Sequence, residues 1–414
     1  MDQVSGSHFK LVYESSEYGN GSTTAPCFIK GTLYQTFNQK YPLNIILKEN
    51  VLDDEFIYLY PIEISAATIE VLNSTNLLNS ISNTVLNHLK TGKIKLIINM
   101  VHDPIIGEST DIIHFEKTMN NIGVDSSNII FIFGNMWEKE HTSNMLFCQG
   151  LQGLTYQARE LHQYPYTSGY ISDCVRESDL NNIHRPKKFV SPNNMMKSHR
   201  VMVAYFAVKY NLLEDGIFSF LQDLSSDQIK STLNYYSNDT TDNINLFSEQ
   251  IANMLPYELD TMGIPPSERW KIVGLPGNVK DWYTNSYLHI VTETLFSGET
   301  CFLSEKIFRP IINLQPFLIF GQPKSLTKLK QLGFKTFSPF INEMYDLEVD
   351  DKKRILMLEK EILKFAKMSL QEIHDWYYSI TDILIYNQKH LASFANCDFF
   401  DEALTKIYNY YTGK

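Results

Sequence analysis

The sequence predicts an α/β protein with two domains, each built around a parallel sheet, and a helical C-terminal region. Three observations support this prediction. The length of 414 residues suits two domains of about 150–200 residues each. Short apolar runs alternate with helical patterns in both halves, which is typical of βαβ units. The end of the chain shows only helical spacing. We therefore expect domains at residues 1–185 and 186–345, and helices at 346–414.

The first domain contains four apolar runs of strand length. The predicted strands are residues 44–47, 56–60, 94–101 and 128–133. Helical spacing predicts helices over residues 76–90 and 111–121, and residues 135–185 are predicted to be a connecting region. Strands that are apolar throughout are usually covered on both faces of their sheet.

The second domain repeats this alternation. The predicted strands are residues 189–191, 288–292, 317–320 and 333–337, and the predicted helices are residues 198–210, 304–313 and 325–332. Residues 221–268 read as mainly helical or irregular. In the tail, apolar side chains recur every three or four residues, and Ser369 with Glu372 predicts a capping box for a further helix that carries Ile373, Trp376, Ile380 and Ile383.

Composition excludes several function classes. The net charge of −11 argues against a protein that follows nucleic acid through its phosphates. Five widely spaced cysteines without a CxxC pair argue against a disulfide framework and against a zinc site: Cys27, Cys148, Cys174, Cys301 and Cys397. The polar N-terminus predicts no signal peptide, and no run is long enough to span a membrane. We expect a cytoplasmic protein.

The densest chemical signal lies at residues 287–321. A strand ends at Glu293, a polar loop follows, and a helix starts at Ser304, Glu305 and Lys306. Ligands of open α/β sheets bind beyond the carboxyl ends of the strands, where a helix N-terminus favours phosphate. Lys306 adds positive charge, and Glu305 or Glu293 can accept hydrogen bonds from a ribose. The pattern predicts a nucleoside-diphosphate pocket, although a serine cap with a glutamate behind it is also typical of an ordinary helix start.

A second signal lies at residues 189–200. A strand leads into a polar loop containing Asn193, and a helix starts at Ser198 with Arg200 in its first turn. An arginine at this end opposes the helix dipole, so its presence indicates an anion to bind. The alternative is a surface arginine on an amphipathic helix.

Together these two segments resemble the α1,3-fucosyltransferase family. That family has a strand, a polar loop and a Ser-x-Arg step, then a glutamate borne on a strand, a Thr-Glu-Lys helix start, and a strand with a proline and a terminal glycine. The corresponding residues are Ser198 and Arg200, then Glu293, Ser304-Glu305-Lys306, Pro316 and Gly321. The match covers mostly residues 187–337. Thr294 stands where the family has asparagine, Ser304 replaces threonine, and the intervening gap is longer, so the resemblance supports the nucleotide-sugar glycosyltransferases better than it supports fucose.

The resemblance implies two Rossmann-like domains facing a cleft, the GT-B architecture, with the donor held by the C-terminal domain and a carbohydrate acceptor by the N-terminal one. It implies that Arg200 and Lys306 neutralise the diphosphate and that Glu305 or Glu293 grips the nucleoside sugar. The candidate donor-binding residues are Asn193, Ser198, Arg200, Glu293, Ser304, Glu305 and Lys306. We expect an inverting enzyme without metal or cofactor. By the resemblance, Arg200, Lys306 and the helix N–H groups make a metal unnecessary, which agrees with the absence of a convincing Asp-x-Asp. GDP-fucose is the donor that the resemblance suggests.

A general base for the acceptor hydroxyl is expected after the strand at 94–101. The family has an acidic residue shortly before a proline here, which points to Asp103, with Glu108 and His102 as alternatives. Asp-Pro also commonly starts a turn. A metal hydrolase that uses His102 and Asp103 would need further spaced ligands, which the sequence lacks. The alternative functions are a nucleotide-sugar epimerase or hydrolase of the same fold, and a non-catalytic glycan-binding relative. The absence of an anchor fits a bacterial or viral origin.

Overall fold

The structure is a computed structural model of the 414-residue chain. It describes residues 9–13, 44–46, 56–63, 81–100, 109–136, 145–149, 154, 158, 174–257, 279–298, 300–394 and 401–413. The chain divides into two compact units. Unit 1 comprises Met1–Gln152 with Cys397–Lys414, and unit 2 comprises Gly153–Asn396.

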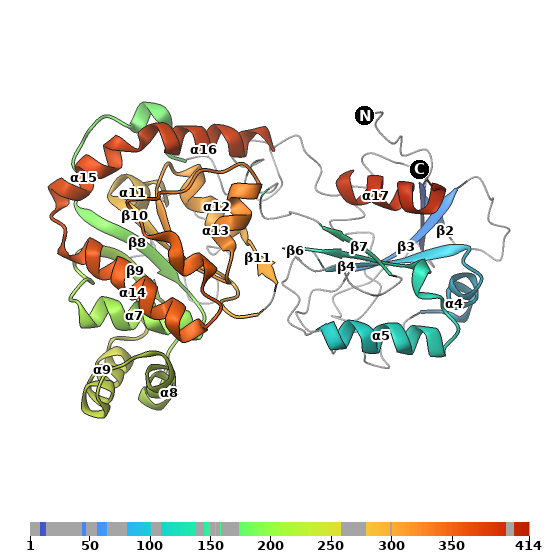
Figure 1. Cartoon of the computed structure of the whole chain (residues 1–414), viewed down its shortest axis with the longest axis horizontal. Helices are drawn as coiled ribbons and strands as arrows, with labels where there is room; N and C mark the ends of the chain where they lie inside the picture. The colour runs from blue at the N-terminus through green and yellow to red at the C-terminus, as the bar shows by residue number, and fades with distance from the viewer. Residues whose placement is uncertain are drawn as a thin grey trace. The chain divides into compact units, whose positions relative to one another are not determined.

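Unit 1 is built on a six-stranded sheet in the order β2-β1-β3-β4-β5-β7, and all of its neighbouring strands are parallel (Figure 1). The strands are β1 (Phe9–Tyr13), β2 (Asn44–Ile46), β3 (Ile57–Glu63), β4 (Ile94–Met100), β5 (Ile129–Phe133) and β7 (Leu146–Gln149), with the short β6 (Asn135–Met136) after β5. The strand order reverses at β1, as in a doubly wound fold.

Helices cover both faces of the unit 1 sheet (Figure 1). They are α4 (Asn83–Lys90) and α5 (Ser109–Asn121) on one face and the chain's last helix, α17 (Asp401–Thr412), on the other, with a short 3-10 turn at Ser126–Asn128. Ile98 of β4 belongs to the same buried cluster as Leu89 of α4, whereas the adjacent Ile97 belongs to the cluster of Leu404 and Ile407 in α17. This two-sided cover explains why β4 is apolar at successive positions.

Unit 2 is built on a four-stranded parallel sheet in the order β12-β10-β8-β9. The strands are β8 (Lys187–Asn193), β9 (Gly216–Phe220), β10 (Ser286–Thr292) and β12 (Phe317–Phe320), with the short β11 (Cys301–Phe302) outside this sheet. The chain passes from β8 to β9 on one side and returns to β10 on the other. The topological switch point of this sheet therefore lies between β8 and β10.

The helices of unit 2 lie on both sides of this sheet; α7 and α16 are on opposite sides (Figure 1). They are α7 (Ser198–Lys209), α8 (Ser226–Tyr236), α9 (Thr241–Met254), α11 (Val279–Thr284), α12 (Glu305–Ile312), α13 (Ser325–Gln331), α14 (Asp351–Lys367), α15 (Leu370–Ser379) and α16 (Thr381–Ser393), with 3-10 turns at Glu177–Asp179 and Glu343–Leu347. Every residue of β10 and β12 is buried. The predicted α/β class with two parallel-sheet domains is confirmed.

Some predicted elements were wrong. The predicted strand at residues 333–337 is absent, because Gly333 (φ 91°) ends α13 and the following phenylalanines are buried by ring packing. The rings of Phe317 and Phe337, for example, lie 5.0 Å apart edge to face. The single helix predicted to carry Ile373 through Ile383 is divided into two helices in the structure, because α15 ends at Ser379 and α16 begins at Thr381. The strands β1, β6, β7, β9 and β11 were not predicted.

Candidate functional site

The two predicted donor segments meet at the switch point of the unit 2 sheet. Asn193 is the last residue of β8, and Glu293 directly follows the last residue of β10. The two strand ends are joined by side chains, since Thr292 Oγ1 donates to Asn193 Oδ1 over 2.7 Å. The amide of Asn193 in turn donates to the carbonyl and hydroxyl oxygens of Ser191. Asn193 therefore fixes the strand ends together, a role that sequence reasoning did not predict.

The first turn of α7 packs against the end of β10. Ser198 is the first helical residue and is exposed, and the preceding Lys197 makes no side-chain capping bond. His199 is buried, and its Nε2 lies 2.8 Å from the carbonyl oxygen of Glu293. Burial lowers the pKa of His199 to about 3, so the ring is neutral at pH 7 and Nε2–H donates to that carbonyl. Sequence reasoning missed His199; the available signal was its place beside Arg200.

Arg200 is also buried, with 7% of its surface exposed. Nη1 donates to the carbonyl of Met195 over 3.0 Å, and Nη2 lies 3.5 Å from the carbonyl of Glu293. Its Nε has no hydrogen-bonding partner among the described residues. Burial lowers the pKa of this guanidinium, and the charges of Glu293 and Glu305 oppose that shift. Arg200 thus supports the loop before α7 and keeps one N–H unused.

The start of α12 supplies the charged side chains of the site. Ser304 caps the helix by accepting from the N–H of Lys306. Lys306 Nζ lies 2.9 Å from Glu305 Oε1 and 3.2 Å from Thr294 Oγ1. Burial acts to raise the pKa of Glu305, but Lys306 and Arg309 outweigh it and lower that pKa to about 2. Glu305 is therefore ionised at neutral pH, and its side chain is 34% exposed.

The loop after β10 is held from two directions. The Phe296 ring is stacked on the His199 ring, with ring centroids 5.3 Å apart. The Arg354 guanidinium also lies over the Phe296 ring, 4.1 Å from its centroid. Arg354 also donates to the carbonyl of Phe296 over 2.5 Å. From the end of β12, Gln322 Nε2 donates to the carbonyl of Ser297 over 2.9 Å. The backbone around Glu293 is consequently fixed before any ligand binds.

This arrangement suits an anionic ligand that also carries hydroxyl groups. A helix N-terminus with an adjacent lysine stabilises phosphate, and carboxylates accept hydrogen bonds from hydroxyls. Among the residues that the structure describes, no group of three or more histidine, cysteine or acidic side chains could hold a metal ion. The three candidate bases, Asp103, Glu108 and His102, lie outside the described residues and stay predictions.

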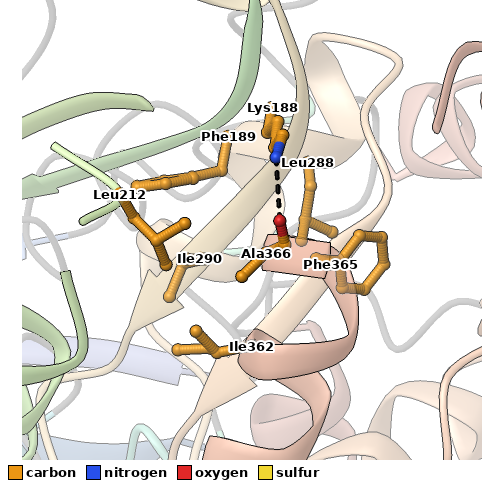
Figure 2. A pocket seen from close by; sticks show the side chains of 8 residues that line it. All are labelled: Lys188, Phe189, Leu212, Leu288, Ile290, Ile362, Phe365 and Ala366. Carbon is orange, nitrogen blue, oxygen red and sulfur yellow. Dashed lines mark hydrogen bonds between the residues drawn. The ribbon is translucent and has the colours of Figure 1, made fainter. Parts of the chain in front are cut away.

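A small apolar cavity of ≈ 10 Å³ lies elsewhere in unit 2, where α14 covers β8 and β10 (Figure 2). It is lined by Lys188, Phe189, Leu212, Leu288, Ile290, Ile362, Phe365 and Ala366. Lys188 Nζ donates to the carbonyl of Ala366 over 2.9 Å, the bond that Figure 2 draws as a dashed line. A volume of this size holds about one water molecule, so it is a packing defect and not a nucleotide pocket.

Comparison with known proteins gives only distant likenesses. No protein-family model and no curated protein sequence matches the chain. Three similar solved structures are an α,α-trehalose-phosphate synthase (UDP-forming) from Burkholderia vietnamiensis, an α,α-trehalose 6-phosphate synthase from Burkholderia multivorans and the N-terminal domain of the Candida albicans trehalose-6-phosphate phosphatase.

The first is 11% identical with a TM-score of 0.37, covering 97% of this chain and 92% of its own. The second is 11% identical with a TM-score of 0.35, covering 98% and 91%. The third is 9% identical with a TM-score of 0.36, covering 90% and 78%. These TM-scores are too low to carry an argument, so the fold assignment rests on the strand orders themselves. Within the described residues, no helix has the length and apolar character needed to cross a membrane.

Proposed function

We propose that this protein is a glycosyltransferase that takes its sugar from a nucleotide donor held by unit 2. The observation that supports this most is the position of the polar cluster. Glu293, Ser304 and Lys306 follow β10, and Arg200 follows β8, at the switch point where open α/β sheets bind their ligands. Two independent sequence patterns thus meet at the place where a nucleotide is expected.

In this proposal the start of α12 binds the diphosphate. Negative charge grows on the leaving diphosphate during the transfer, and Lys306 with the N–H groups of the first turn would stabilise it. Preorganised donors of this kind lower the activation free energy of the reaction. Glu305 is ionised and partly exposed, so it is the better placed carboxylate for the nucleoside sugar. Arg200 contributes its positive charge to the diphosphate site, and its hydrogen bond to the carbonyl of Met195 fixes the loop before α7.

The remaining parts of the proposal rest on the family resemblance. The reaction inverts the anomeric centre without a metal, with Asp103 as general base and Glu108 or His102 as alternatives. Unit 1 supplies the carbohydrate acceptor site, and GDP-fucose is the first donor to test.

The test is a thermal-shift panel with GDP, UDP, ADP, CMP and dTDP, each with and without EDTA. A ligand at 100 times its dissociation constant stabilises the fold by about 2.7 kcal/mol. We expect one diphosphate to stand out and its shift to survive EDTA. A selective shift with GDP supports the fucosyl donor, and a selective shift with another nucleotide keeps the glycosyltransferase and discards fucose. No shift with any nucleotide contradicts the proposal.

Two assays separate the competing functions. An epimerase or hydrolase of the same fold turns over the nucleotide sugar when no acceptor is present. A glycan-binding relative binds glycans and is indifferent to both Asp103→Ala and Lys306→Ala. The proposed transferase requires both the acceptor and Lys306.

The variant Lys306→Ala should weaken binding of the selected diphosphate by about 1.5–3 kcal/mol, the scale of a charge-assisted hydrogen bond. The matched control is Lys360→Ala, which removes an exposed lysine from α14. Isothermal titration of both variants decides the question: equal affinities in Lys306→Ala and the control would remove the start of α12 from the donor site.

A further inference from the structure

Glu293 is a fully buried carboxyl group directly behind the first turn of α12, with 0% of its surface exposed. Its Oε2 accepts from Ser304 Oγ over 2.5 Å and from the N–H groups of Thr294 and Ser304 over 3.2 and 3.4 Å. Its Oε1 has no hydrogen-bonding partner among the described residues. Burying a charged group with one oxygen unpaired costs folding free energy, so stability does not explain this side chain.

Ser304 transmits the position of Glu293 to Lys306. Because the Ser304 hydroxyl donates to Glu293, its oxygen is free to accept, and it lies 3.2 Å from the backbone nitrogen of Lys306 and 3.5 Å from Nζ. Lys306 Nζ is also 3.2 Å from Thr294 Oγ1, on the residue next to Glu293. One carboxylate therefore orients one hydroxyl, and that hydroxyl contacts both the backbone and the ammonium of the lysine.

The end of β12 leaves just enough room for this side chain. A Cβ atom at Gly321 would lie 3.4 Å from Cγ of Glu293 and 3.0 Å from Oγ of Ser325. Glycine at this position allows the Glu293 side chain to lie behind the start of α12 without displacement.

We propose that Glu293 is a positioning residue that acts through Ser304 to hold Lys306 and the α12 N-terminus in place for a diphosphate. This inference rests on the proposed function and deepens it. Glu293 does not itself contact the donor, because it is wholly buried, whereas the neighbouring Glu305 is partly exposed. The two carboxylates near the switch point thus have different roles. Glu305 contacts the ligand, whereas Glu293 positions Ser304 and Lys306, and Lys306 contacts the diphosphate.

The test compares a nucleoside diphosphate with the nucleoside that lacks the phosphates, both titrated into the full chain. Ser304→Ala and Glu293→Gln should each weaken binding of the diphosphate about tenfold, the loss expected when a charge-assisted contact is misplaced. Binding of the nucleoside should change less than about twofold, since it does not use Lys306. Ser304→Thr keeps the hydroxyl and should restore diphosphate affinity to near the starting value.

Further variants guard against a general structural effect. Ser304→Gly removes the hydroxyl at little capping cost, so it reports on the relay if Ser304→Ala folds poorly. The double variant Glu293→Gln with Ser304→Ala should be no weaker than the weaker single variant, because both break the same chain of contacts. Equal diphosphate affinity in Ser304→Gly, Glu293→Gln and the unmodified protein overturns the inference, as does equal loss of nucleoside and diphosphate. If the unmodified protein binds no nucleotide, the proposed function itself fails.

Discussion

At the amino end of β8 and β10, Arg185, Tyr287, His374 and Tyr377 form a buried polar cluster whose members satisfy one another. Arg185 Nη1 donates to two backbone carbonyls over 2.8 and 2.7 Å, Nη2 donates to the Tyr377 hydroxyl over 2.6 Å, and its backbone N–H donates to the Tyr287 hydroxyl. At the carboxyl end of the same strands, Arg200 and Glu293 are as deeply buried, yet each keeps one polar atom without a partner among the described residues.

This difference indicates what each end of the sheet is for. Nearly all buried polar groups in folded proteins are paired, and a fully paired network makes the fold rigid. The amino-end cluster has this property: the Tyr377 hydroxyl accepts from Arg185 and donates to the carbonyl of Leu314 over 2.7 Å. An unpaired buried atom opposes folding, and Arg200 Nε and Glu293 Oε1 lie where a ligand is proposed to bind; such atoms also occur elsewhere in unit 2, for example Gln315 Oε1 and Trp376 Nε1. The comparison predicts that damage at one end reduces stability and damage at the other reduces binding.

The largest expected effect is on stability, from Arg185→Leu. The substitution removes three side-chain hydrogen bonds and the stacking of the guanidinium on Tyr377, whose ring centroid lies 4.0 Å away. We expect a loss of about 2–4 kcal/mol in the free energy of unfolding, measured by urea denaturation. Nucleotide affinity of the folded protein should be unchanged. A loss below about 1 kcal/mol would show that the amino-end cluster does not stabilise the fold.

The matched substitution at the other end, Arg200→Leu, should reverse this pattern. Arg200 makes one good hydrogen bond, to Met195, and one at the limit of length, to the carbonyl of Glu293. We expect a smaller loss of stability, roughly 1–2 kcal/mol, and a loss of about tenfold in diphosphate affinity by titration. If Arg200→Leu destabilises the protein as much as Arg185→Leu does and binds nucleotide normally, the contrast between the two ends is wrong.

A smaller effect is expected from Tyr377→Phe, which keeps the ring and removes only the hydroxyl. That hydroxyl accepts from Arg185 and donates to the carbonyl of Leu314. Losing it should lower the free energy of unfolding by about 1–2 kcal/mol, because a buried donor and a buried acceptor lose their partner. Thermal unfolding measures this change, and Tyr378→Phe on the same helix serves as the control.

How far the sequence predicted this site depends on the range of the interactions. The residues around Ser304 and Arg200 were predictable, because a strand, a loop and a helix start are local patterns in the chain. The bond from His199 to the carbonyl of Glu293 joins residues 94 positions apart, and no local pattern shows it. The strand order that places β8 beside β10 is equally long-range. Likewise the burial of Glu293 depends on α7, α12 and β12 together. The sequence alone therefore could not decide whether Glu293 binds the ligand itself or positions the residues that bind it.

The smallest expected effect is a difference between Glu293 and Glu305 in how their contributions to the free energy of unfolding change with pH. Burial raises the pKa of Glu293, partly opposed by Lys306 and Ser304. Its contribution to stability is therefore fully present below its ordinary pKa of 4.5 and is lost as the pH rises through the raised value. Glu305 has its pKa lowered to about 2, so its contribution is present above 4.5 and is lost only as the pH falls toward 2.

Urea unfolding at several pH values between about 4.5 and 7.5 tests this prediction with Glu293→Gln and Glu305→Gln. The difference in unfolding free energy between the unmodified protein and Glu293→Gln should shift against the unmodified protein as the pH rises, because only the glutamate must bury a charge. Above about pH 5.5 the difference for Glu305→Gln should stay constant, since Glu305 is then ionised in both the folded and the unfolded protein. A flat difference for Glu293→Gln would mean that its carboxyl ionises as easily in the folded protein as in the unfolded chain. Glu293 would then carry no folding penalty, and the contrast between the two ends of the sheet would rest on Arg200 alone.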